Sequence, residues 1–261
     1  MGQQRWTIEE EYNYSKWIEA NVTEDFLIRY NIPVDCADVP YVFRWIYARI
    51  AHLPAGATTG TNRFIGHWST EFRHLPTSPV WYKDRRFRAA LMAMLSATST
   101  KTLSRDVYPI RIDRESVIAG TAFLVSETHA GIVANIVMDG STTHPVQTFE
   151  AGMPTRIQKL RLRNFISPDP GGGRIAGLIK FRWPIENGGH WYYLPIEEHP
   201  FYSREQYSHS FTKGYADYLE AVARRIDPTI YDPNEKVEKV INTLSRRLND
   251  RIPIIIDRKS T

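Results

Sequence analysis

Apolar residues recur at helical spacing through the first hundred positions of the chain. This pattern predicts helices over 7–20, 23–30, 36–51 and 84–103, and the first opens with the capping-box pair Thr7 and Glu10. Residues 53–80 lie between two of these helices and are rich in Gly, Thr, Ser and Pro. We expect a long ordered loop there, of a length that is often functional.

After residue 106 the pattern changes to short β-branched and aromatic runs separated by turn residues. Strands are expected within 107–112, 120–126, 129–139, 143–151, 155–165 and 175–183. Asp139-Gly140 is a strong hairpin signal, "SPDPGGG" (167–173) is a second turn, and helices are expected again over 203–226 and 233–250. This order of helices, antiparallel sheet and helices predicts an α+β fold. We expect one catalytic domain over 1–261, with a core over about 1–200 and a helical extension over about 201–261.

Composition narrows the classes of partner. The chain has 261 residues, 42% of them hydrophobic, and a net charge of +4, which predicts a folded protein with mild affinity for polyanions. No Lys/Arg run or nucleic-acid motif occurs, so we expect no nucleic-acid partner. No apolar run approaches the roughly 18 residues that a membrane span needs, and the first residues lack the apolar segment of a signal peptide.

The only cysteine, Cys36, precedes an apolar helical stripe that includes Val39, Val42 and Phe43. Pro40 is tolerated only in the first turn of a helix, so the helix must begin close to Cys36. Unpaired N–H groups and the helix dipole at such a position favour a thiolate and can stabilise an oxyanion. The alternative is a thiol that only packs, which is the commoner fate of a free cysteine.

A nucleophilic thiol needs a base, and His129 is the best placed of the eight histidines. It stands at the start of a predicted strand after a short turn, and the small residues Ala130 and Gly131 would leave its ring accessible. The alternative is a strand-end histidine that is hydrogen-bonded locally.

Two blocks, "DCADVPYVFRWIY" and "AGTAFLVSETHAGIVANIVMDG", together resemble the NlpC family of papain-like cysteine peptidases, which cut bacterial peptidoglycan. The resemblance implies that Cys36 is the nucleophile and His129 the general base, with no cofactor. The chain departs from the family at Ala37-Asp38, where a Ser-Gly pair is usual, and at "FLIRYNIP", which replaces an aromatic and Gly-Gly segment. In the family these positions shape the substrate side of the cleft.

The third member of the site follows from strand register. With Asp139-Gly140 as a two-residue turn, His144 faces Asn135, six residues from His129 and roughly 20 Å away at ~3.4 Å per residue. Glu150 then pairs directly opposite His129. We therefore predict Glu150 as the group that orients His129, with His144 and then Gln147 as the alternatives.

Two other features were weighed as binding sites. No HExxH or CxxC motif occurs, and His67 and His74 lack further ligands near them, so no metal site is expected. The aromatic segment "KFRWPIENGGHWYYLP" (180–195) suits either a wall on which sugars stack or a core strand followed by a hairpin, and we favour the second.

We therefore expect a papain-like cysteine hydrolase, and the resemblance implies that its substrate is a peptide-stem amide of peptidoglycan or another peptide. We expect a bacterial periplasmic or secreted protein, for example an antibacterial effector opposed by an inhibitor or immunity protein; the cytoplasm is the alternative. Two other functions stay open, a transglutaminase-like acyl transferase using Asp139 and a binding module without catalysis. The C-terminal helices are expected either to border the cleft or only to extend the core.

Overall fold

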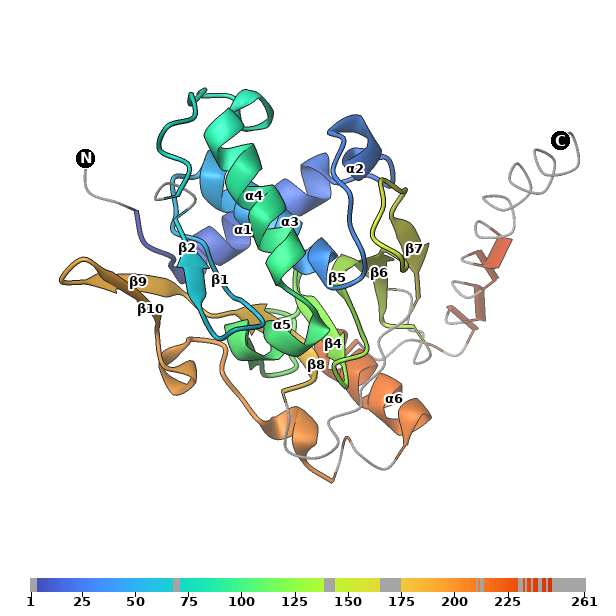
Figure 1. Cartoon of the computed structure of the whole chain (residues 1–261). Coiled ribbons are helices and arrows are strands. Elements are labelled where there is room, and N and C mark those ends of the chain that lie inside the picture. Colours follow the sequence, from blue (N-terminus) through green and yellow to red (C-terminus); the bar gives the residue numbers. More distant parts are fainter. Residues whose placement is uncertain are drawn as a thin grey trace, which may run out of the picture.

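A computed structural model describes residues 4–67, 71–138, 144–164, 175–209, 211, 214–229 and separate positions between 232 and 245 (Figure 1). Its helices are α1 (Ile8–Asn21), α2 (Phe26–Arg29), α3 (Asp38–Ile50), α4 (Arg85–Ala97), α5 (Thr100–Asp106) and α6 (Tyr215–Ile226). Its strands are β1 (Gly56–Thr58), β2 (Phe64–Gly66), β3 (Val107–Pro109), β4 (Ala122–Val125), β5 (His129–Ile136), β6 (Val146–Glu150), β7 (Arg161–Arg163), β8 (Gly177–Phe181), β9 (Pro184–Asn187) and β10 (His190–Tyr193). The mixture of helices with an antiparallel sheet confirms the predicted α+β class.

The central sheet has six strands in the order β3-β8-β4-β5-β6-β7, and every neighbouring pair is antiparallel. Two separate hairpins, β1–β2 and β9–β10, lie outside this sheet. The ends of β5 and β6 that carry His129 and Glu150 are brought together by the pairing of β5 with β6.

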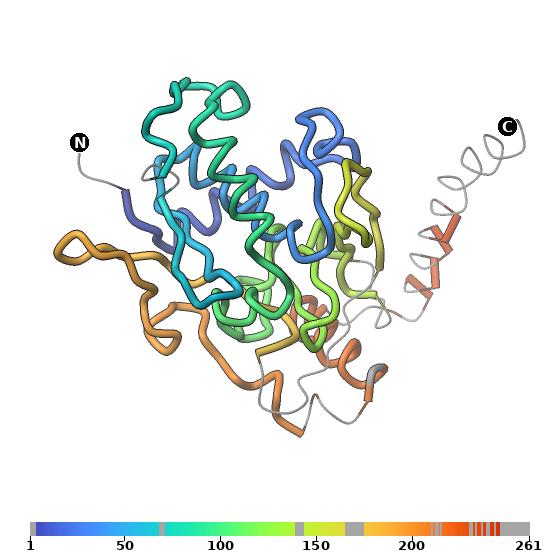
Figure 2. Tube along the Cα trace, viewed as in Figure 1, coloured from blue at the N-terminus to red at the C-terminus, as the bar shows by residue number. Residues whose placement is uncertain are grey.

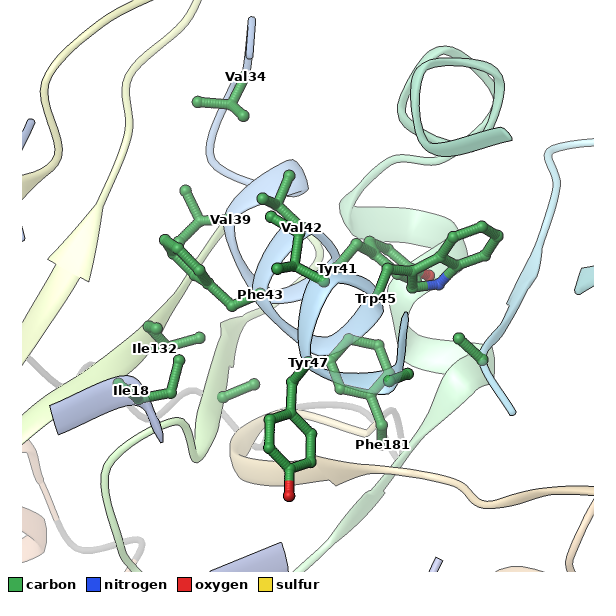
Figure 3. Packing of buried hydrophobic residues seen from close by; sticks show 14 of the residues in the cluster. Ile18, Val34, Val39, Tyr41, Val42, Phe43, Trp45, Tyr47, Ile132 and Phe181 are labelled. Atoms are coloured by element: carbon green, nitrogen blue, oxygen red, sulfur yellow. The ribbon is translucent and has the colours of Figure 1, made fainter. Parts of the chain in front are cut away.

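Helix α3 is the centre of the larger hydrophobic core (Figures 1 and 3). The apolar stripe predicted from the sequence is buried, since Val39, Val42 and Phe43 have no exposed surface. Figure 3 shows these side chains spread around α3, with Ile132 of β5 and Ile18 of α1 on one side. Burial of this stripe fixes α3, and with it the residues just before it, against the sheet.

A second core forms on the other face of the sheet, because successive side chains along a strand point to opposite faces. In β4, Ala122 and Leu124 belong to the α3 core, whereas Phe123 belongs to the second core together with Tyr218 and Val222 of α6. The tube in Figure 2 shows α6 below the sheet, away from α3. Helix α6 therefore covers a sheet face and extends the core.

The structure differs from the predicted elements at three places. The predicted loop over 53–80 contains the β1–β2 hairpin, whose residues Gly56–Thr58 pair with Phe64–Gly66. The helix predicted over 84–103 is divided into α4 and α5, because Thr98 is extended and Ser99 begins a new capping box with Thr102. The helix predicted over 203–226 begins only at Tyr215, and Glu205–Tyr207 form a single 3-10 turn.

The N-terminal cap of α1 is confirmed, whereas some predicted turns and a predicted helix lie outside the described residues. Thr7 caps α1 by accepting a hydrogen bond from the Glu10 N–H, as predicted. The two turns at 139–140 and 167–173 and most of the helix predicted over 233–250 lie outside the described residues. Among the helices that the structure describes, none is long and apolar enough to cross a bilayer.

Candidate active site

The predicted nucleophile lies directly before α3. Helix α3 starts at Asp38 and Ala37 already has helical backbone angles, so Cys36 sits at the N-terminal end of the helix and Pro40 in its first turn. Cys36 is free and only 6% exposed. The predicted placement of this thiol at a helix start is thus confirmed, whereas its chemical role rests on its neighbours.

Two carboxylates shape the turn that holds Cys36. Asp35 accepts a hydrogen bond from the Ala37 N–H at 2.9 Å, and Asp38 accepts one from the Asp35 N–H at 2.8 Å. Burial raises the pKa of Asp38 to about 7. The backbone N–H groups of Asp35 and Ala37, on either side of Cys36, are therefore already hydrogen-bonded. Neither of them is available in this structure to bind an oxyanion, although the sequence predicted that neighbouring N–H groups would do so.

The segment before Cys36 is tied to the chain that follows β6. Val34 pairs with Arg156 as an isolated antiparallel bridge. The amide of Gln158, which is almost fully buried, donates to the carbonyls of Val34 at 2.8 Å and of Gly152 at 2.7 Å. This buried clamp connects the Cys36 turn to the end of the strand that carries Glu150. No local sequence pattern marks Gln158, because its partners lie up to 124 residues away along the chain.

His129 stands at the start of β5, where it contacts both Cys36 and Glu150. Its Nε2 lies 2.9 Å from Glu150 Oε2, and the Cys36 side chain is close enough to His129 to influence its pKa. The Cys36 side chain and then the Glu150 carboxylate raise the pKa of His129 to about 9, against the opposing effect of burial. At neutral pH the ring is therefore protonated.

Glu150 reaches His129 by a different route from the predicted one. Ile132 pairs with Phe149, and a bulge lies between Val133 and Asn135, so the register puts Glu150 beside Gly131 and not directly opposite His129. The predicted direct pairing is wrong, and the contact is diagonal, a distance that long side chains span. Any side chain at position 131 would collide, because its Cβ would lie 2.6 Å from the Phe149 carbonyl oxygen.

Thr148 holds the second oxygen of the Glu150 carboxylate. The Thr148 hydroxyl is fully buried and donates to Glu150 Oε1 at 2.7 Å, which leaves Oε2 for His129. The sequence gives a weak signal for this residue, since positions 148 and 150 of one strand share a face of the sheet. The order of contacts is therefore Thr148, Glu150, His129 and Cys36.

The alternative orienting groups lie elsewhere. Gln147 pairs with Asn135 and accepts a hydrogen bond from its side-chain amide at 3.3 Å, six residues along β5 from His129. His144 precedes the start of β6, whereas Glu150 ends it. Asp139, the acid of the transglutaminase-like alternative, lies outside the described residues.

The chain matches no family model, no curated protein and no solved structure. Its chemistry must therefore be argued from its own residues. Within the described part of the chain, no group of three or more His, Cys, Asp or Glu side chains is placed to hold a metal ion.

Removing the charge of Glu150 should lower the pKa of His129, because the carboxylate stabilises the protonated ring. We expect Glu150→Gln to slow turnover less than His129→Ala, and to move the alkaline fall in rate to lower pH. Thr148→Val removes the hydroxyl that holds Oε1 of Glu150 and should lower the rate by about tenfold. The measurement is the pH profile of the rate.

The matched control is His144→Ala, which should leave both the rate and the alkaline limb close to wild type. If the pH profile of the rate moved in His144→Ala but not in Glu150→Gln, His144 and not Glu150 would be the group that orients His129.

Proposed function

We propose that this protein is a cysteine-dependent amide hydrolase with a papain-like arrangement of its site, in which Cys36 is the nucleophile. The observation that carries the proposal is the contact of His129 with both Cys36 and Glu150. A buried thiol that only packs does not need a protonated imidazole beside it, and a strand-end histidine does not need a buried carboxylate. Together the three residue types form the nucleophile, base and orienting group of acyl-transfer enzymes.

In the proposed reaction the proton of the Cys36 thiol has passed to His129 before attack. The Cys36 sulfur adds to an amide carbonyl carbon, and the resulting oxyanion is assigned to the N–H of Cys36, because those of Asp35 and Ala37 are engaged. The imidazolium gives its proton to the leaving amine as the C–N bond breaks, which leaves a thioester. Water then loses a proton to His129 and attacks the thioester, and the C–S bond breaks to release the acid.

The substrate class rests on the resemblance of the two blocks around Cys36 and His129 to NlpC-type peptidases. On this basis the bond cut is an amide in the peptide stem of peptidoglycan, and the working place of the enzyme is the bacterial periplasm or the outside of the cell. The Cys36 side chain is nearly buried, whereas that of His129 is 32% exposed, so substrate would approach from the side of the imidazole.

The test is mass spectrometry of purified peptidoglycan after incubation with the wild-type chain and with Cys36→Ala. We expect the wild type to release fragments cut at an amide of the peptide stem, and the variant to release none. Identical fragments from both proteins, or no fragments from either, would contradict the proposal.

Modification by iodoacetamide at pH 6 separates an enzyme from a binding module on the same scaffold. Fast labelling of Cys36 is expected, because the protonated His129 favours the thiolate. Slow labelling, at the rate of an ordinary thiol, would favour the module. Products in which an added amine has replaced water would favour the transglutaminase-like acyl transferase.

A further inference from the structure

A cavity of about 260 Å³ lies between α4 and the two hairpins β1–β2 and β9–β10. Figure 1 shows these hairpins side by side at one edge of the molecule, and the stacking of Trp191 on His67 joins them. Trp45 lines the cavity from α3, seven residues after Asp38, or roughly 10 Å along the axis at ~1.5 Å per residue. The cavity is thus separate from the Cys36 end of α3.

Four aromatic rings contribute to its wall. The rings come from four elements or segments of the chain, as follows: Trp45, Phe64, Phe72 and Trp191. Trp191 stacks on His67 with ring centres 4.6 Å apart, and Phe64 packs edge-on against Tyr193 at 5.0 Å. Burial lowers the pKa of His67 to about 4, so this supporting ring is uncharged at neutral pH.

Charged groups are placed at the mouth and balance one another. Arg63 and Glu71 both line the cavity, form an ion pair and remain largely exposed, and His190 joins them at the rim. The mouth therefore offers hydrogen-bond donors and acceptors without a net charge. Such a site suits a neutral ligand with apolar faces and many hydroxyl groups at its edge.

The β1–β2 hairpin is anchored to the core, and the β9–β10 hairpin packs on it through Trp191 and Tyr193. The backbone N–H of Thr58 in β1 donates to the buried Asp106 at 2.7 Å, which also accepts from Tyr41 of α3. The β9–β10 turn is formed by Gly188 and Gly189, both with positive φ, which is the geometry of the two-residue hairpin turn that twists with its strands. The aromatic wall is therefore built before a ligand arrives, which lowers the cost of binding.

We propose that this cavity binds one pyranose ring of a neutral saccharide. A pyranose has C–H faces that pack on the negative face of an aromatic ring, and hydroxyl groups at its rim that Arg63, Glu71 and His190 can meet. The volume is below the ~300–1,000 Å³ of sites for drug-sized ligands, which fits a single ring. The inference goes beyond the proposed hydrolase function and does not depend on it; if both hold, the site binds the glycan while Cys36 cuts the peptide.

The test is calorimetric titration of the full chain with the β-1,4-linked tetramer of N-acetylglucosamine and with the β-1,4-linked tetramer of glucose. We expect saturable binding of at least one tetramer, together with a change in tryptophan fluorescence. Trp191→Ala should weaken that binding by about tenfold or more, because it removes one aromatic wall. Ala93→Phe should abolish it by filling the cavity from α4.

The matched control is Tyr192→Ala. Tyr192 is exposed and neighbours Trp191 in β10, so its side chain points to the opposite side of the hairpin, and its removal should leave binding unchanged. Melting temperatures of all variants show whether each remains folded. The proposal would be overturned if neither tetramer bound. It would also be overturned if a tetramer bound but neither Trp191→Ala nor Ala93→Phe changed its affinity.

A third probe separates the saccharide from a purely apolar ligand. N-acetyl-phenylalanine amide should not compete with the tetramers; its binding in their place would overturn the proposal. The two proposals fail separately, because saccharide binding without peptidoglycan cleavage leaves the cavity assignment intact, and cleavage without saccharide binding leaves the Cys36 assignment intact.

Discussion

Cys36→Ala will abolish hydrolysis while leaving the protein folded. Loss of a nucleophile from a hydrolase costs about a million-fold in rate, because the remaining groups cannot form the covalent intermediate. Alanine fits the site, since Cys36 is buried just before a helix and the next residue, Ala37, is already an alanine. The lost burial of one sulfur should cost about 1 kcal/mol, or roughly 2–4 °C in melting temperature.

The measurement is the rate of amide release alongside the circular dichroism spectrum and melting temperature. Cys36→Ser is the matched variant, because it keeps the size of the side chain and a polar hydrogen but offers a much weaker nucleophile; it should be as inactive as alanine. A well-folded Cys36→Ala protein with full activity would show that the nucleophile assignment is wrong.

The residues around the site differ in how far the sequence could predict them. The start of α3 is set by local rules, since Pro40 must lie in a first turn and the apolar stripe must face the core. The start of β5 at His129 is likewise marked by the turn before it and by the β-branched run after it. Both positions are therefore predictable from neighbouring residues alone.

The register between β5 and β6 is not predictable in this way. Counting back from a two-residue turn places His144 opposite Asn135 and Glu150 opposite His129, but Asn135 pairs with Gln147, three positions further along. The bulge between Val133 and Asn135 then takes back one position, so the register at His129 is displaced by two. A bulge leaves no composition signal in a run such as this one. Glu150 nevertheless contacts His129 as predicted, because a long glutamate side chain spans the diagonal.

The remaining contacts depend on tertiary structure. Gln158 meets Val34 and Gly152 only after β6 and the Cys36 turn have come together, and no local pattern marks it. The same holds for the aromatic cavity: the segment 180–195 does form the predicted hairpin, but Trp191 finds its partner His67 in a segment expected to be a loop. Sequence patterns therefore predicted the elements better than the side-chain contacts between them.

His129→Ala will cost several orders of magnitude in rate, about 10³-fold or more, because His129 is the group assigned both to accept the thiol proton and to protonate the leaving amine. Labelling of Cys36 by iodoacetamide at pH 6 should slow as well, since the imidazolium that favours the thiolate is gone. In the wild type, activity should fall as pH rises through about 9, where His129 loses its proton.

The same residue links folding stability to pH, which gives a readout independent of catalysis. The pKa of His129 is raised from 6.5 to about 9 in the folded chain. Its contribution to stability is therefore fully present below about pH 6.5 and is lost as pH rises through about 9. The melting temperature of His129→Ala should therefore not show this fall as pH rises through about 9. The control His144→Ala should show the same fall as the wild type. Both the rate of Cys36 labelling and the melting temperature are measured against pH. If each depends on pH in the same way in His129→Ala as in the wild type, His129 is not paired with Cys36.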